Sequence, residues 1–107
     1  MNGIFFKKSL FLIVFFCFSI FVFGSENYSM GESLFKNNSP EEAIPYFRLA
    51  LTEPDVNKMV YNYLGLCYYQ VGKLQESLDT FLKGTTVSGT NKRQLFYNAG
   101  NSAFSSC

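Results

Sequence analysis

The chain has 107 residues, of which 48% are hydrophobic, and its 9 Lys and Arg residues nearly balance its 8 Asp and Glu residues. This near-neutral charge argues against a nucleic-acid partner, because phosphate binding needs an excess of basic side chains on one face. The chain has no His, the commonest general base and metal ligand. We therefore expect no catalytic residue, no metal site and no cofactor, and the length suits one small domain.

Residues 1–24 differ from the rest of the chain in composition. They hold 8 of the 13 Phe residues, two Lys and no acidic residue. The two lysines precede an apolar run, Leu10–Phe23, which has a single serine. A helix of this length spans roughly 21 Å, less than the roughly 30 Å hydrocarbon core of a bilayer. The pattern is typical of a secretory signal, with cleavage expected between Gly24 and Ser25.

An uncleaved signal anchor is the alternative interpretation, since Ile4–Phe6 lengthens the apolar stretch beyond the two lysines. Cys17 does not fit a lipoprotein signal, because Phe16 precedes it where a small residue is required. Residue usage rich in Phe, Asn, Lys and Ser favours a bacterial source. We expect export to the periplasm or cell envelope, or, in the alternative, anchoring in the inner membrane through residues 1–24.

Two cysteines follow the signal, Cys67 and Cys107. Export to an oxidising compartment permits a disulfide between them. Cys67 lies in an apolar helical stretch, and Cys107 lies at a terminus of the kind that frays. The sequence therefore favours a buried thiol at Cys67, with the disulfide as the alternative.

The remaining segment repeats with a period of about 34 residues, and such self-similarity at a fixed period indicates a repeat architecture. Gly31, Gly65 and Gly100 lie in three similar helical stretches, at nearly equal spacings along the chain. A second pattern follows the first two glycines at matching distance, so that Phe47 and Phe81 are separated by the same period. The two patterns are therefore in register with each other.

Local signals place the helix boundaries and exclude strands. Ser39–Glu42 reads as a capping box with proline at the first helical position. Pro54 ends the first pair of helices. Nothing alternates with period two for long enough to form a strand. The predicted fold is all-α, with five helices near 26–37, 40–52, 57–71, 74–86 and 91–105.

These positions resemble the tetratricopeptide repeat (TPR) family. Its pattern is an aromatic, then Leu-Gly, then Tyr on a first helix, followed by Ala, an aromatic and Ala on a second. The middle segment matches at Tyr61, Leu64, Gly65, Tyr68, Gly72, Ser77, Phe81 and Gly84. The first matches at Gly31, Leu34, Ala43, Phe47, Ala50 and Pro54, but has Asn27 in place of the aromatic and Met30 in place of Leu. The third has Phe96, Ala99, Gly100 and Ala103.

The resemblance implies an array of helical hairpins, about two and a half repeats long. The repeats are expected at about 25–57, 58–92 and, in part, 93–107. A glycine in the first helix lets the second helix approach closely, which offsets the roughly 1 kcal/mol that a helical glycine costs. The residues expected to pack the repeats together are Gly31, Ala43, Phe47, Ala50, Leu64, Gly65, Tyr68, Phe81 and Gly100.

In this family the first helix of each pair lines a concave face. The resemblance implies that this face binds a peptide or a helix of a protein partner, through aromatic rings and amide groups. The expected contact residues are Tyr28, Phe35, Asn62, Leu66, Tyr69, Tyr97, Asn101 and Phe104. The alternative is that the aromatic four residues after each glycine packs against the neighbouring repeat.

The third repeat has no second helix in this sequence, although its one helix is apolar around much of its circumference. Two hypotheses follow: the chain is a truncated fragment of a longer TPR protein, or another copy or a partner covers this helix. We expect a non-catalytic protein–protein interaction scaffold of the bacterial cell envelope. A membrane-anchored assembly subunit, tethered by residues 1–24, is the alternative.

Overall fold

A computed structural model describes residues 26–106. The predicted signal, residues 1–24, and Cys107 therefore lie outside the described residues. Within 26–106 the chain is all-α, with five helices and no strand, which confirms the predicted fold class. The helices are a first one over 26–36, then α2 (Pro40–Ala50), α3 (Val60–Gln70), α4 (Leu74–Thr85) and α5 (Lys92–Ser105). None of these helices combines the length and the apolar character that crossing a bilayer requires.

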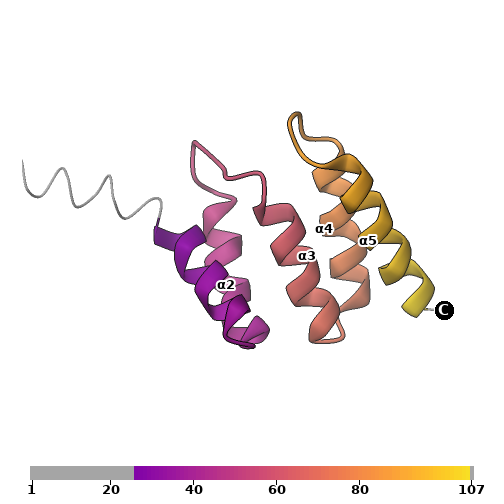
Figure 1. Ribbon diagram of the computed structural model, residues 1–107, viewed down its shortest axis with the longest axis horizontal. Coiled ribbons are helices and arrows are strands. Elements are labelled where there is room, and N and C mark those ends of the chain that lie inside the picture. Colours follow the sequence, from indigo (N-terminus) through magenta and orange to yellow (C-terminus); the bar gives the residue numbers. More distant parts are fainter. Residues whose placement is uncertain (1–25, 107) are drawn as a thin grey trace, which may run out of the picture.

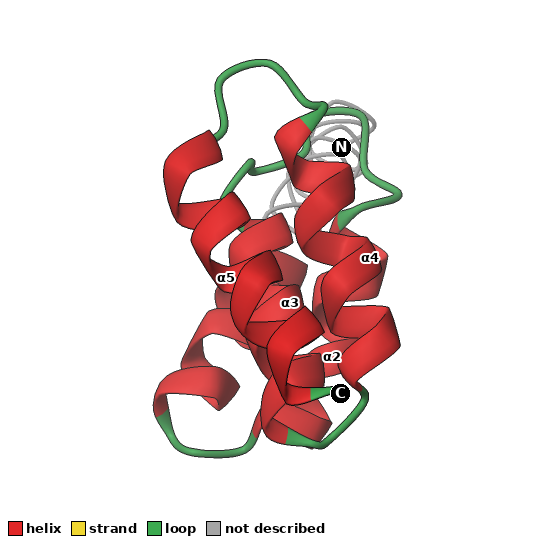
Figure 2. Cartoon of the chain, turned by 90° about the vertical axis from the view of Figure 1, so that its right-hand side faces the viewer, coloured by secondary structure: helices red, strands yellow, loops and turns green. Residues whose placement is uncertain are grey.

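The five helices form two layers. Figures 1 and 2 show the 26–36 helix, α3 and α5 in one layer and α2 and α4 in the other. Each helix therefore lies against the next one along the chain, and α3 contacts α2, α4 and α5. The connections between successive helices are at most nine residues long, and neighbouring helices run antiparallel.

The turns of the two helix pairs repeat each other one period apart. Asn38 in the first turn has φ 61°, and Gly72 in the second has φ 85°. The residues that follow each donate a backbone hydrogen bond five residues back, from Ser39 to Leu34 at 2.9 Å and from Lys73 to Tyr68 at 2.8 Å. This is the bond of a Schellman motif, in which one left-handed residue ends a helix. Each turn thus sends the chain back along the helix it has just left.

The ends of α2 and α4 repeat in the same way. The hydroxyl of Thr52 donates to the carbonyl of Leu49 at 2.6 Å, and the hydroxyl of Thr86 donates to that of Lys83 at 2.7 Å. Each of these carbonyls also accepts the backbone N–H of the same threonine, so the hydroxyl adds a second hydrogen bond at the end of the helix. The same hydrogen bonds therefore recur in the two helix pairs with the period that was read from the sequence.

Two details of the sequence prediction are wrong. Ser39 is the N-cap residue of α2 and Pro40 follows it, but the Ser39 side chain makes no capping hydrogen bond. Helix α3 begins at Val60, three residues later than expected. The delay arises because the side chain of Asn57 accepts a hydrogen bond from the Met59 amide at 3.0 Å, which holds this segment in a turn.

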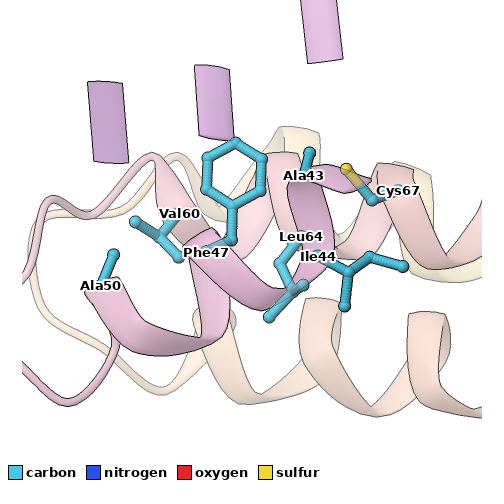
Figure 3. Close-up of a cluster of buried hydrophobic side chains, with 7 residues drawn as sticks. All are labelled: Ala43, Ile44, Phe47, Ala50, Val60, Leu64 and Cys67. Carbon is cyan, nitrogen blue, oxygen red and sulfur yellow. The ribbon is translucent and has the colours of Figure 1, made fainter. Parts of the chain in front are cut away.

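The larger core cluster lies between α2 and α3 and extends to the 26–36 helix. Its buried residues are Ala43, Ile44, Phe47, Ala50, Val60, Leu64 and Cys67, shown in Figure 3. Phe47 is fully buried and stacks on Tyr63, with ring centroids 5.6 Å apart and planes within 4° of parallel. Because Phe47 belongs to the first pair and Tyr63 to the second, this stack joins the two pairs.

The smaller cluster joins α4 to α5 and contains polar groups. Phe81, Leu95 and Ala99 form its apolar part. Beside it, the hydroxyl of Ser77 donates to the Gly65 carbonyl at 2.8 Å and lies 2.8 Å from the hydroxyl of Ser102. Both serines are fully buried, so these bonds compensate for their desolvation.

Two of the three repeated glycines each hold a phenylalanine ring from the next helix. A Cβ atom at Gly31 would lie 2.8 Å from the ring of Phe47, and one at Gly65 would clash with the ring of Phe81. Gly100 differs from this expectation, because it is exposed and a Cβ atom there would have no neighbour within 4 Å. The reason is that no helix follows α5 within the described residues.

Cys67 is a free thiol, fully buried in the larger cluster. Burial raises its pKa from the ordinary 9.0 to about 12. Between these values the unfolded thiol loses its proton and the folded one keeps it, so stability falls as the pH rises. We expect the unfolding free energy to fall less in Cys67→Ala than in the wild type between about pH 9 and about pH 11, by at most about 1.4 kcal/mol per pH unit.

Urea titrations of both proteins at several pH values measure this difference. A parallel pH dependence in the two proteins would contradict the burial of the thiol. Both proteins share every other ionisable group, so the comparison isolates the contribution of the Cys67 thiol.

Candidate interaction surface

The predicted binding residues of the 26–36 helix are engaged in packing. Phe35 lies edge-on to Tyr63, with ring centroids 5.3 Å apart. Tyr28 contacts both Phe47 and Tyr63, at 6.2 and 6.1 Å between centroids. Both side chains are partly buried against the larger core cluster. The contact of Phe35 is the kind expected under the packing alternative, which concerned the aromatic four residues after each glycine.

A short polar chain lies beside them on the same helix. The Tyr28 hydroxyl donates to the Glu32 carboxylate at 2.9 Å, and the Lys36 ammonium donates to its other oxygen at 3.3 Å. Burial, and then the bond to Glu32, raise the pKa of Tyr28 above its ordinary range. The bond from Tyr28 is the main cause that lowers the pKa of Glu32. The side chains of Tyr28, Glu32 and Lys36 therefore fix one another's positions on the 26–36 helix.

Helices α3 and α5 together form the more accessible part of the predicted face. The hydroxyls of Tyr69 and Ser105 lie 3.1 Å apart, which joins the C-terminal ends of the two helices. Further toward their N-termini, the amide of Asn98 donates to the side-chain oxygen of Asn62 at 2.7 Å. Gln94 in turn donates to Asn98 at 3.4 Å. We call this surface, which spans α3 and α5, the α3–α5 face.

The predicted residues on this face differ in exposure. Tyr97 and Phe104 are 68% and 85% exposed, Tyr69 is 37% exposed, and Asn101 is also exposed. Asn62 is partly buried through its bond to Asn98, and Leu66 is partly buried against the smaller core cluster. Tyr69, Tyr97, Asn101 and Phe104 are therefore the predicted residues with the most surface to offer a partner.

A hollow opens between the N-terminal halves of α3 and α5. Its lining combines apolar, amide and hydroxyl groups, from Lys58, Met59, Asn62, Thr90, Asn91, Gln94 and Leu95. Met59 contributes an exposed thioether side chain to this lining. Such a lining accepts an apolar side chain and offers amide groups to its backbone.

Sequence reasoning missed the polar residues that fix α5 in place. Asn98 and Ser102 are buried and bond to α3 and α4 respectively. Their spacing of four residues puts them on one side of α5 with Leu95 and Ala99. The available signal was that Asn98 and Ser102 share the spacing of the apolar core positions Leu95 and Ala99 on α5.

The chemistry that this surface offers is contact and hydrogen bonding. Among residues 26–106, acidic and thiol side chains do not gather in threes as they would around a metal ion. The α3–α5 face presents rings, amides and hydroxyls, and Lys58 is among the residues that line the hollow. No protein-family model, curated protein or solved structure matches the chain, so the inference of function depends on this geometry.

Proposed function

We propose that the protein is a non-catalytic interaction scaffold of TPR type that binds a peptide or a helix of another protein on the α3–α5 face. The proposal of a TPR-type array is supported by the hydrogen bonds that recur with the period of the sequence and by the pairs Gly31–Phe47 and Gly65–Phe81. The binding proposal is supported chiefly by three accessible rings on one face, Tyr69, Tyr97 and Phe104.

The chemistry of the face indicates the kind of segment that it would bind. Exposed tyrosine and phenylalanine supply rigid contact area at low cost in conformational entropy. The hollow beside Asn62 and Met59 suits one apolar side chain of the segment. Neighbouring amides, such as those of Gln94 and Asn101, offer hydrogen bonds to a peptide backbone. We therefore favour a weakly charged segment with at least one apolar anchor.

Site-specific photo-cross-linking in cells tests this proposal. A photoreactive phenylalanine replaces Tyr69 or Tyr97 in the full chain, and a control places it at Leu49, which is exposed on α2 in the opposite layer. We expect a discrete adduct with a different protein, and not with a second copy of the chain, from positions 69 and 97, and no such adduct from position 49. The adduct should weaken when Phe104→Ala is added, because that ring lies on the same face. Equal adducts from all three positions, or none, would rule out binding here.

The proposed location is the bacterial cell envelope, reached by export. Its support is the composition of residues 1–24, a lysine pair followed by an apolar run. The alternative, an assembly subunit that keeps residues 1–24 as an anchor, has the same binding face. The intact mass of the protein recovered from cells separates the two, because export with cleavage leaves Ser25 as the first residue.

A further inference from the structure

The outer side of α5 carries three exposed aromatic rings around a glycine. Phe96, Tyr97 and Phe104 are 56%, 68% and 85% exposed. Gly100 lies between them, with open space beside it. Helical geometry at 100° per residue places the three rings within about 60° of Gly100, on the side away from Leu95, Asn98 and Ser102. This group of four residues is referred to below as the outer α5 face.

Two other glycines of this chain, each in the middle of a helix, are covered by a neighbouring helix. Gly31 and Gly65 each hold a phenylalanine ring from an antiparallel neighbouring helix. Gly100 occupies the matching position on α5, where it has no such ring. The helix that completes this face should therefore run antiparallel to α5 and bring an aromatic ring close to Gly100.

A second copy of α5 meets this requirement because the outer α5 face is symmetric about Gly100. Phe96 and Phe104 lie four residues before and four residues after the glycine. When two copies of α5 cross antiparallel at Gly100, Phe96 of each lies opposite Phe104 of the other. A two-fold axis produces this arrangement, since both copies then contribute the same patch. The small glycine allows the two helix backbones to approach closely at the crossing point.

Charge also favours the antiparallel arrangement. Helix α5 has a basic pair, Lys92 and Arg93, at its start and no acidic residue. In a parallel pair of helices the four positive charges would lie together. In an antiparallel pair they lie at opposite ends, so the repulsion between them is small. We propose that the protein forms a symmetric dimer in which the outer α5 faces of two copies pack antiparallel across Gly100.

The exposed area sets the expected strength of this dimer. The three rings together expose the equivalent of about two aromatic side chains, or on the order of 400 Å² per copy. The dimer would then bury about 800 Å², less than the roughly 1,200 Å² typical of stable interfaces. We therefore expect a dimer that exchanges with monomers, and a test that captures it covalently is appropriate.

Disulfide trapping in cells that produce the full chain tests the proposal. Cys17→Ser and Cys107→Ser leave buried Cys67 as the native thiol, and Gly100→Cys then places a second thiol on the proposed axis. With copper phenanthroline and dissolved oxygen as the oxidant, two such thiols lose two protons and two electrons and form one bond. We expect a band of twice the chain mass. A control with Lys83→Cys, exposed on α4, should give at least tenfold less.

Two further variants separate this dimer from other outcomes. Phe96→Asp should reduce the trapped dimer at least tenfold, because it puts a charge opposite Phe104 of the other copy. Tyr97 and Phe104 belong to both faces, so the dimer and a bound partner segment compete for these two rings. Tyr69→Ala, which lies on the α3–α5 face and outside the outer α5 face, should leave the dimer unchanged while it weakens the photo-cross-link proposed above. Resistance of Cys67 to alkylation shows that each variant is folded. Monomer alone, equal trapping at position 83, or trapping to a different protein would overturn the proposal.

Discussion

Phe81→Ala is expected to lower the unfolding free energy by about 3–5 kcal/mol. The Phe81 ring is almost fully buried, and it lies in the space that Gly65 leaves open on α3. It also belongs to the cluster that holds α5, with Leu95 and Ala99. A small domain has a total stability on the order of 5–15 kcal/mol, so this variant should be largely unfolded under mild denaturing conditions.

Urea unfolding followed by helical circular dichroism measures this loss. The matched control is Phe104→Ala, which removes the same ring from a position that is 85% exposed and should change the stability by less than about 0.5 kcal/mol. Similar losses in the two variants would show that Phe81 does not fill a core position.

Gly65→Ala and Gly100→Ala are expected to change stability in opposite directions. Alanine favours a helix over glycine by about 1 kcal/mol at both positions. At Gly65 the new methyl group would overlap the ring of Phe81, which is too buried to move freely, and overpacking of this kind costs about 1–3 kcal/mol. At Gly100 it meets no atom within 4 Å. We expect a net loss of up to about 2 kcal/mol at position 65 and a gain of up to about 1 kcal/mol at position 100.

Thermal unfolding of the two variants and the wild type, at a concentration low enough to avoid association, measures the contrast. Both changes in stability, the loss at position 65 and the gain at position 100, are measured relative to the wild type. A gain at position 65 equal to the gain at position 100 would mean that α4 does not approach α3 as closely as described.

The helices and their pairing could be predicted from the sequence because the signal was repeated. One glycine in an apolar helix is weak evidence, but Gly31 and Gly65 with Phe47 and Phe81 in the same register specify one packing arrangement twice. The turns follow from residues that tolerate positive φ, Asn38 and Gly72. The start of α3 was misplaced because a side-chain bond from Asn57 competes locally with the helix.

The candidate surface was harder to predict, because side chains on one helical face divide between packing and exposure. Phe35 and Tyr69 hold equivalent positions one period apart, yet Phe35 packs on Tyr63 and Tyr69 bonds to Ser105 at the surface. That difference depends on which side chains of the next helix pair lie opposite each residue, and helical periodicity contains no information about those side chains. Likewise, the bonds of Asn98 and Ser102 arise from side chains on other helices.

The most direct test of the fold that underlies both proposals is a double-mutant cycle between Gly65 and Phe81. Phe81→Leu shrinks the side chain that the new methyl group of Gly65→Ala would overlap. The account predicts that the double variant loses at least about 1 kcal/mol less stability than the sum of the two single losses, because the smaller leucine leaves room for the new methyl group and the methyl group fills part of the space that the ring vacates. Strictly additive losses would contradict it, since they would place the Phe81 ring away from Gly65.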